Sequence, residues 1–230
     1  GEFIESYWKK VNSDIISVLN ESYCEAGEMF DLCMKKSREI EYDALIYGGE
    51  EYSDLLSLAY RQVIAAHKIA VDPDGEIVFI SKECFSNGCA ATVDVTYPSS
   101  PFFIHYNTEL LKGMLRPIFK FASSDEWEFD FAPHDAGQYP LVLGQVYGTN
   151  HIEDGRYLEF QMPVEECGNM ILLTYAYYVI TKDKDFLTEN YFTLSKWANY
   201  LKNKGVILDN QLCTDDFAGH SKKNVNLAIK

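Results

Sequence analysis

The sequence predicts an all-α protein made of αα-hairpins, with a short β-hairpin or isolated strands in its long loops. Apolar residues recur every three or four positions over most of the 230-residue chain, which is the period of an amphipathic helix. Glycine, proline and polar residues separate these runs, and short connections between antiparallel helices are typical of αα-hairpins. A hydrophobic content of 47% supplies a sizeable core for such a fold.

The N-terminal part is expected to hold three helices, a turn and a strand. The expected helices run from Ile4 to Asn20, from Tyr23 to Ala44 and from Tyr52 to Ala70. Tyr47-Gly48-Gly49 separates the second helix from the third, because glycine is a poor helix former. Asp72-Pro73-Asp74-Gly75 has the composition of a turn, and the alternation at residues 76–81 predicts a short strand.

The C-terminal part is expected to hold four more helices. Residues 82–106 lose the helical period, apart from a β-like stretch at residues 92–97. Residues 123–161 form a long loop of the kind that is usually functional or disordered, and its aromatic side chains argue against disorder. The first of these helices is capped by Asn107 or Thr108 and ends at Ala122, and the second begins at Pro163. The third runs from Phe186 to Lys204, and the fourth begins at about Lys222.

The charge of the chain narrows the classes of partner. The net charge of −15 is spread along the sequence and argues against nucleic acid and anionic membrane surfaces, because both require basic patches. No apolar run approaches the roughly 20 residues of a membrane span. A small-molecule substrate is compatible with this composition.

The six cysteines show no CxxC or Cys/His metal spacing, so no metal and no other cofactor is expected. They are expected to be mostly reduced, which favours a reducing compartment. A catalytic thiol at Cys167 or Cys213, paired with His134 or His220, is disfavoured because neighbouring carboxylates raise the pKa of a thiol.

Three acid-rich segments, residues 134–140, 162–169 and 211–220, each adjoin an apolar helical run. If consecutive helices alternate in direction, the loop before the fifth helix and the loop after the sixth open at the same end. The N-terminus of the fifth helix lies at that end too, so the three segments are expected to share one rim. Residues 82–106 are expected at the opposite end unless their extended part runs back across the fold.

Five carboxylates are candidate catalytic residues: Asp135, Glu165, Glu166, Asp215 and Asp216. Hydrolysis without a metal needs a base that activates water and an acid that protonates the leaving group, and two carboxylates in different environments can divide these roles. One of Asp215 and Asp216 is expected to face the cleft, unless both cap the following turn. Glu165 and Glu166 begin the fifth helix, where pairing with the helix dipole is the alternative interpretation. Asp135 is a candidate for positioning water or substrate.

Six residues are candidates for substrate binding: His134, Tyr139, Asn169, Asp94, Lys82 and Glu83. His134 and Tyr139 lie in the first acid-rich segment, although a lone loop histidine is more often structural. Asp94, Lys82 and Glu83 qualify only if residues 82–106 reach the shared rim; a local ion pair is the alternative interpretation.

Several of these motifs, taken in order, resemble the glutaminase A family. They are Leu58-Ala59-Tyr60-Arg61-Gln62-Val63, Lys82-Glu83, Thr92-Val93-Asp94-Val95, Tyr97-Pro98-Ser99-Ser100-Pro101 and the three acid-rich segments. The resemblance is to the helical-hairpin domain of that family and covers about residues 52–230. It implies part of an (α/α)6 toroid over residues 51–230, preceded by a helical linker region at residues 1–50. It also implies secretion, whereas the cysteines favour a reducing interior.

Three functions are open at this point. The first, implied by the resemblance, is a hydrolase that releases ammonia from the side-chain amide of L-glutamine. The second is an inverting glycoside hydrolase on the same toroid, with carboxylates roughly 6.5–9.5 Å apart and with Trp127, Tyr139 or Tyr147 stacking on sugar. The third is a non-enzymatic scaffold that binds a ligand at an acidic rim. The remaining hairpins or a neighbouring domain of the parent chain are expected partners.

Overall fold

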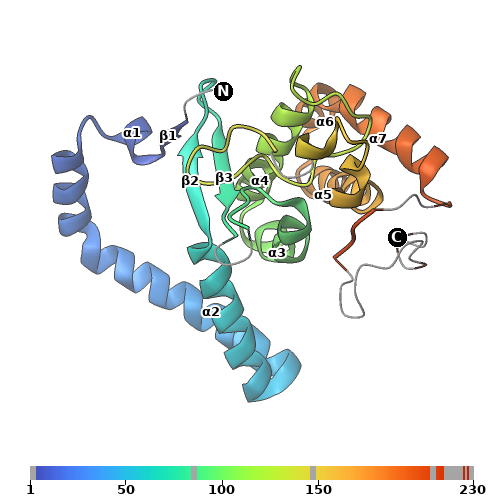
Figure 1. Ribbon diagram of the computed structural model, residues 1–230. Helices are drawn as coiled ribbons and strands as arrows, with labels where there is room; N and C mark the ends of the chain where they lie inside the picture. Colours follow the sequence, from blue (N-terminus) through green and yellow to red (C-terminus); the bar gives the residue numbers. More distant parts are fainter. Residues whose placement is uncertain are drawn as a thin grey trace. The chain divides into compact units, whose positions relative to one another are not determined.

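Helices dominate the computed structural model, which describes residues 4–83, 87–145, 149–207 and 211–214 together with residues 225 and 227 (Figure 1). This confirms the all-α fold class. The chain divides into two units, residues 2–76 and residues 77–230, each with its own internal packing. None of the helices in the described ranges combines the length and the apolar character that crossing a bilayer requires.

The first unit begins with a short strand and a single helical turn, whereas one helix was expected from Ile4 to Asn20. β1 (Glu5–Ser6) pairs antiparallel with β2 (His67–Val71), and α1 covers only Trp8–Val11. The next helix, α2 (Ile15–Ala65), starts afresh because the Asp14 carboxylate caps it, accepting a hydrogen bond from the Ser17 N–H at 2.9 Å. The periodic apolar pattern ran through this cap, and the prediction of one helix was therefore wrong.

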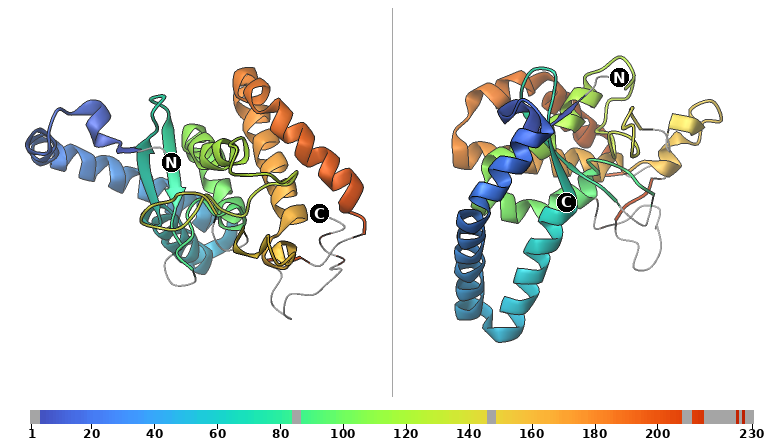
Figure 2. Two further views of the ribbon diagram at one scale, coloured as in Figure 1. Left: turned by 45° about the horizontal axis from the view of Figure 1, so that its top comes forward. Right: turned by 90° about the vertical axis from the view of Figure 1, so that its left-hand side faces the viewer.

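The helix α2 reverses direction at Gly49, as the glycine pair in the sequence indicated. Gly49 has φ 81° and ψ −175°, outside the helical region, and the two arms of α2 fold back along one another (Figure 2). The Ser53 hydroxyl donates to the Glu41 carbonyl at 3.0 Å and ties the arms together near the turn. The second arm ends at Ala65, not at Ala70 as expected, because residues 67–71 pair as a strand. Short apolar runs do not distinguish helix from strand.

The second unit contains one strand, five α-helices and two short 3₁₀ turns within its described residues. They are β3 (Ile77–Ser81), α3 (Val93–Tyr106), α4 (Thr108–Ala122), η1 (Thr149–His151), η2 (Tyr157–Phe160), α5 (Pro163–Thr181), α6 (Lys184–Glu189) and α7 (Tyr191–Lys204). The strand β3 and the helices α4 and α5 were expected. The helix expected from Phe186 to Lys204 is instead two helices that meet at Asn190.

The helix α3 corrects the β-like interpretation of residues 92–97. The stretch is rich in valine, threonine and tyrosine, and Pro98 and Pro101 lie inside the helix, so its intrinsic preference is not helical. Burial decides the outcome: Val93 and Phe103 are enclosed, and the Phe103 ring meets the Phe79 ring edge-on at 5.2 Å. Packing therefore overrides local propensity here.

The core of the second unit lies around α4 and α5. Buried apolar side chains of α4 pack against β3, α3 and α5, and the Phe119 ring stacks on Trp197 of α7 at 5.2 Å. The Arg116 guanidinium, although buried, donates to the Ile77 carbonyl at 2.6 Å. This core fixes the N-terminal end of α5, where the second acid-rich segment lies.

Replacing Gly113 by alanine is expected to destabilise the protein by about 1–3 kcal/mol. Gly113 lies on α4 against β3, and a Cβ there would lie 3.2 Å from both the Ile77 carbonyl oxygen and the Phe79 nitrogen, with no flexible side chain to yield. Gly27→Ala is the matched control, because nothing lies within 4 Å of its Cβ position on α2 and alanine favours the helix. Urea unfolding of both variants measures the difference, and a Gly113→Ala protein as stable as the wild type would contradict this packing.

The start of α6 is held by an ionised carboxylate. Asp183 caps the helix, accepting hydrogen bonds from the N–H groups of Asp185 at 3.1 Å and Phe186 at 3.0 Å. Lys112 of α4 donates to it at 2.9 Å, and the Tyr177 hydroxyl at 2.8 Å. The hydrogen bond from Lys112, followed by the bond from the Phe186 N–H, holds the pKa of Asp183 far below its usual value.

Because the folded-state pKa of Asp183 is lowered, its contribution to stability is present above the unfolded pKa of about 3.9 and is lost as pH falls through the folded value. Asp183→Asn is expected to cost about 1–3 kcal/mol near neutral pH. Below about pH 4 the gap to the wild type is expected to shrink. Urea unfolding at several pH values measures this gap, with the exposed Asp185→Asn as control. A gap that stays constant into acid would refute the ionised cap.

Candidate active site

The described parts of the three acid-rich segments meet at the N-terminal end of α5. The Gln145 side chain donates to Asp135 Oδ2 at 3.4 Å and exchanges hydrogen bonds with the side chain of Gln161, the residue just before the second segment. The Val164 N–H donates to Gln211 Oε1 of the third segment at 3.1 Å. The expectation of one shared rim is therefore confirmed for these residues.

The loop between β3 and α3 also reaches this rim, which was the condition set for Asp94, Lys82 and Glu83. The Ala90 N–H donates to the Gly137 carbonyl at 2.8 Å, and the Ala136 N–H donates back to the Ala90 carbonyl at 3.0 Å. The Val93 N–H donates to the His134 carbonyl at 2.9 Å. These backbone bonds place the first turn of α3, with Asp94, beside the first acid-rich segment.

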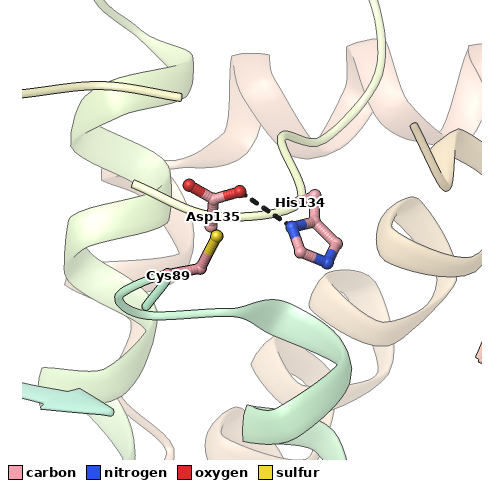
Figure 3. A group of neighbouring side chains, drawn as sticks. All are labelled: Cys89, His134 and Asp135. Carbon is pink, nitrogen blue, oxygen red and sulfur yellow. Dashed lines mark hydrogen bonds and ion pairs between the residues drawn. The ribbon is translucent and has the colours of Figure 1, made fainter. Parts of the chain in front are cut away.

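His134 lies at the centre of the site. Its Nδ1 is hydrogen-bonded to Asp135 Oδ2 (Figure 3), with 2.8 Å between the two atoms, and its Nε2 is 3.8 Å from Asp94 Oδ1. One potential ligand atom from each of Glu83, Asp94 and His134 lies within 4.8 Å of the others. Burial alone lowers the pKa of His134, but the hydrogen bond and charge of Asp135, with the charges of Asp94 and Glu83, outweigh it and raise the pKa.

Asp135 is enclosed and fully engaged. It is 1% exposed, its Oδ1 accepts a hydrogen bond from the Gly137 N–H at 2.7 Å, and its Oδ2 faces His134 and Gln145. Gly137 has φ 119°, and a Cβ there would lie 2.7 Å from the Gly144 carbonyl oxygen, so only glycine fits. This arrangement suits orientation of the imidazole better than contact with a substrate.

Glu165 and Glu166 both lie in the first turn of α5 but face different neighbours. Glu165 binds the third segment: one oxygen accepts from the Thr214 N–H at 2.9 Å and the other from the Thr214 hydroxyl. Glu166 is 0% exposed and accepts a hydrogen bond from the Asn169 side chain at 3.2 Å. Asp215 and Asp216, which follow Thr214 in the sequence, lie outside the described residues, as does His220.

Asp94 carries the most informative electrostatic perturbation. Burial raises its pKa, and the negative charges of Glu83 and Glu165 raise it further, outweighing the opposing effect of His134. Asp94 and Glu165 lie in the first turns of α3 and α5, two helices that pack against each other. A half-buried acid with a raised pKa, placed among other acids, is typical of a functional site.

Lys82 and Tyr139 form the exposed edge of the site. The Lys82 ammonium lies 5.2 Å from the centre of the Tyr139 ring, and the Tyr139 N–H donates to the Gly88 carbonyl at 3.0 Å. Partial burial raises the pKa of the Tyr139 hydroxyl, so it is a hydrogen-bond donor at neutral pH. Lys82 therefore supplies a positive charge next to a largely acidic site.

The sequence did not indicate a role for Cys89, nor for Gln145 and Thr214, which bind Asp135 and Glu165. The Cys89 side chain lies beside His134 and Asp135 (Figure 3), with its ligand atom and theirs within 4.8 Å of one another. Burial, followed by the charge of Asp135, raises the pKa of the Cys89 thiol, so it stays protonated. No spacing in the sequence marks Cys89 or Gln145; the only available signal was the position of Thr214 directly before two aspartates.

Two alternatives lose support from the packing. The Cys167 sulfur is fully buried, accepts a hydrogen bond from the Ala132 N–H at 3.2 Å, and has a pKa raised mainly by burial, which disfavours a thiolate nucleophile. Trp127 is 3% exposed and its indole N–H donates to the Phe131 carbonyl at 2.8 Å. It is a core residue and has no free face for a sugar ring. Tyr147 lies outside the described residues.

Comparison with known proteins gives the same family for most of the chain. Residues 49–230 match the family model described as the glutaminase A six helical-hairpin domain. Glutaminase A of Aspergillus oryzae is 35% identical over 226 residues, which is 98% of this chain and 31% of that protein. A protein of Arthroderma benhamiae named as a probable glutaminase is 26% identical over 280 residues, covering 97% of this chain and 31% of its own length.

The chain thus spans about a third of the length of these two relatives. The match over residues 49–230 includes all three acid-rich segments, Glu83 and Asp94. The chain belongs to the glutaminase A family, through its six helical-hairpin domain.

Proposed function

We propose that this chain carries the active site of a glutaminase-like amidohydrolase, which releases ammonia from L-glutamine by acid–base activation of water. The observation that carries the proposal is the meeting of Glu83, Asp94 and His134, from three separate stretches of sequence, in one group where the charge of Glu165 also acts on Asp94. The family and the names of two relatives support the substrate class. The activity of the whole protein is also part of the proposal, because the chain spans only about a third of its relatives' length. Further hairpins or a neighbouring domain of the parent chain would complete the site.

Water activation is assigned to the carboxylates at the start of α5 and in the third segment. Both oxygens of Glu165 are held by Thr214, so its carboxylate has a fixed orientation, as a general base requires. Asp215 or Asp216, next in the sequence to Thr214, serves as the acid that protonates the leaving ammonia. Glu166 and Asn169, which bond each other in the interior, position the first turn of α5.

A site that binds a free amino acid needs one positive and one negative group, because the ligand carries an α-carboxylate and an α-ammonium. The α-carboxylate needs a cation, and Lys82 at the exposed edge is suited to this role, with the Tyr139 hydroxyl as an additional donor. The α-ammonium needs an anion, which the carboxylates of the site supply. Asp135 acts on His134 and does not itself touch the substrate in this proposal.

Ammonia release from L-glutamine by the full-length protein tests the proposal, with a panel of aryl glycosides assayed in parallel. We expect turnover of L-glutamine, no turnover of glycosides, and loss of ammonia release in Asp216→Asn. Turnover of a glycoside without ammonia release would replace this proposal with a glycoside hydrolase. If the protein turned over neither L-glutamine nor any glycoside, a non-enzymatic ligand-binding scaffold would be the remaining interpretation.

A further inference from the structure

Three hydrogen-bond acceptors converge on one point beside His134. They are a Glu83 carboxylate oxygen, from the loop after β3, an Asp94 carboxylate oxygen, from the first turn of α3, and a ring nitrogen of His134. The side chains of His134 and Asp94 are only 5% and 13% exposed. Glu83 lies 11 positions before Asp94, and Asp94 lies 40 positions before His134, which is no recognisable metal-ligand spacing, so no metal site was expected from the sequence.

The orientation of His134 places an electron pair in this group. Its Nδ1 is 2.8 Å from Asp135 Oδ2, so Nδ1 carries a proton, and Nε2 faces Asp94 and can act as an acceptor whenever the ring is neutral. Asp94 Oδ1 is buried from solvent and accepts no hydrogen bond from the described residues. Protonating the ring would not satisfy it, because 3.8 Å exceeds hydrogen-bond distance. A cation bound among the three side chains would give Asp94 Oδ1 a partner.

The spacing of the acceptors separates a metal ion from an ammonium group. Two ligands bound about 2.0–2.2 Å from a metal ion lie about 3.5 Å apart at the tetrahedral angle. Two acceptors that each lie about 2.9 Å from one ammonium nitrogen are about 4.7 Å apart at the same angle. The distance of 3.8 Å between His134 Nε2 and Asp94 Oδ1 is closer to the metal value.

We propose that Glu83, Asp94 and His134 form a binding site for a first-row divalent cation such as Zn²⁺ or Mn²⁺. One imidazole nitrogen and two carboxylate oxygens suit these ions, whereas Ca²⁺ prefers oxygen ligands alone. Asp135 is the outer partner that fixes the imidazole, as carboxylates commonly do behind a metal-binding histidine. The site does not depend on the reaction proposed above, because cation binding is measured without substrate.

Isothermal titration of the metal-stripped full-length protein with Zn²⁺, Mn²⁺ and Ca²⁺ tests the site. We expect saturable binding of Zn²⁺ or Mn²⁺ that weakens at least about 10-fold in Asp94→Asn and in Glu83→Gln, with Ca²⁺ much weaker. Asp125→Asn, an exposed carboxylate beyond α4, is the matched control and should bind like the wild type. The proposal would be overturned if the wild type bound neither Zn²⁺ nor Mn²⁺. It would also be overturned if both ligand variants bound these ions as tightly as the wild type.

A spectroscopic readout separates ligand loss from unfolding. Co²⁺ added to the stripped protein is expected to give visible d–d absorption that is lost in Glu83→Gln and retained in Cys89→Ser, because the thiol is not a ligand. Circular dichroism melts of the metal-free variants show whether each has folded; if Asp94→Asn has not, the partly exposed Glu83→Gln decides the test. A Co²⁺ spectrum that persists in a folded Glu83→Gln protein would exclude this ligand set.

Discussion

Glu165→Gln is expected to lower kcat for ammonia release from L-glutamine by about 10³-fold while KM changes little, because a general base contributes about 10²–10⁴-fold to the rate. Glutamine keeps the size and can still accept a hydrogen bond from Thr214, which binds both oxygens of the native side chain. It cannot take a proton from water. Steady-state assays of the full-length protein measure kcat and KM separately.

Glu159→Gln is the matched control for this variant, because Glu159 is an exposed carboxylate in η2, a few residues before α5. It is expected to leave kcat within about 2-fold of the wild type, as surface changes away from a site usually do. Equal melting temperatures of the two variants would show that neither is misfolded. A Glu165→Gln protein with wild-type kcat would remove Glu165 from the chemistry and leave Asp215 and Asp216 as the acid–base pair.

Asp135→Asn is expected to destabilise the folded protein by about 3 kcal/mol, because it removes one partner of a buried charged pair. In the wild type, the hydrogen bond and charge of Asp135 overcome the effect of burial and raise the pKa of His134. A raised folded pKa contributes stability that is fully present below the unfolded value of about 6.5 and is lost as pH rises through the folded value. Asp94 and Glu83 are the other charged groups that favour the protonated ring.

Without Asp135, burial dominates and the folded pKa of His134 is expected to fall. The difference in unfolding free energy between the wild type and Asp135→Asn should therefore be larger at about pH 5.5 than at about pH 8.5. Urea unfolding in the presence of EDTA measures this difference. Asp125→Asn serves as the control with no such pH dependence. A gap that grows toward alkaline pH would mean that the Asp135–His134 contact does not stabilise the charged ring.

The regular helices of the second unit followed from the sequence, because local signals and packing agree there. Asn107 caps α4, with its side chain accepting from the Leu110 N–H, and Pro163 begins α5. The helix α3 could not be predicted, because Pro98 and its β-branched neighbours disfavour a helix that only burial against other elements stabilises. The strand β2 was hidden for a related reason: an apolar run after a long helix fits either period.

The candidate site was predictable in outline and not in detail. Alternation of helix direction was enough to bring Asp135 and Glu165 to one end of the fold. The approach of Asp94 and Cys89 depends on backbone hydrogen bonds between two loops, and no sequence pattern encodes such a pairing. The different contacts of Glu165 and Glu166 could not be predicted from the sequence either, since both residues lie in the first turn of the same helix.

A crystal structure of the full-length protein with the product L-glutamate is the most direct test that this group of side chains is a glutaminase site. We expect the amino acid beside Glu165, with its side-chain carboxylate within about 3.5 Å of a Glu165 oxygen and its α-carboxylate near Lys82. L-Glutamate bound elsewhere, in a protein that releases ammonia from L-glutamine, would show that the active site lies outside this group.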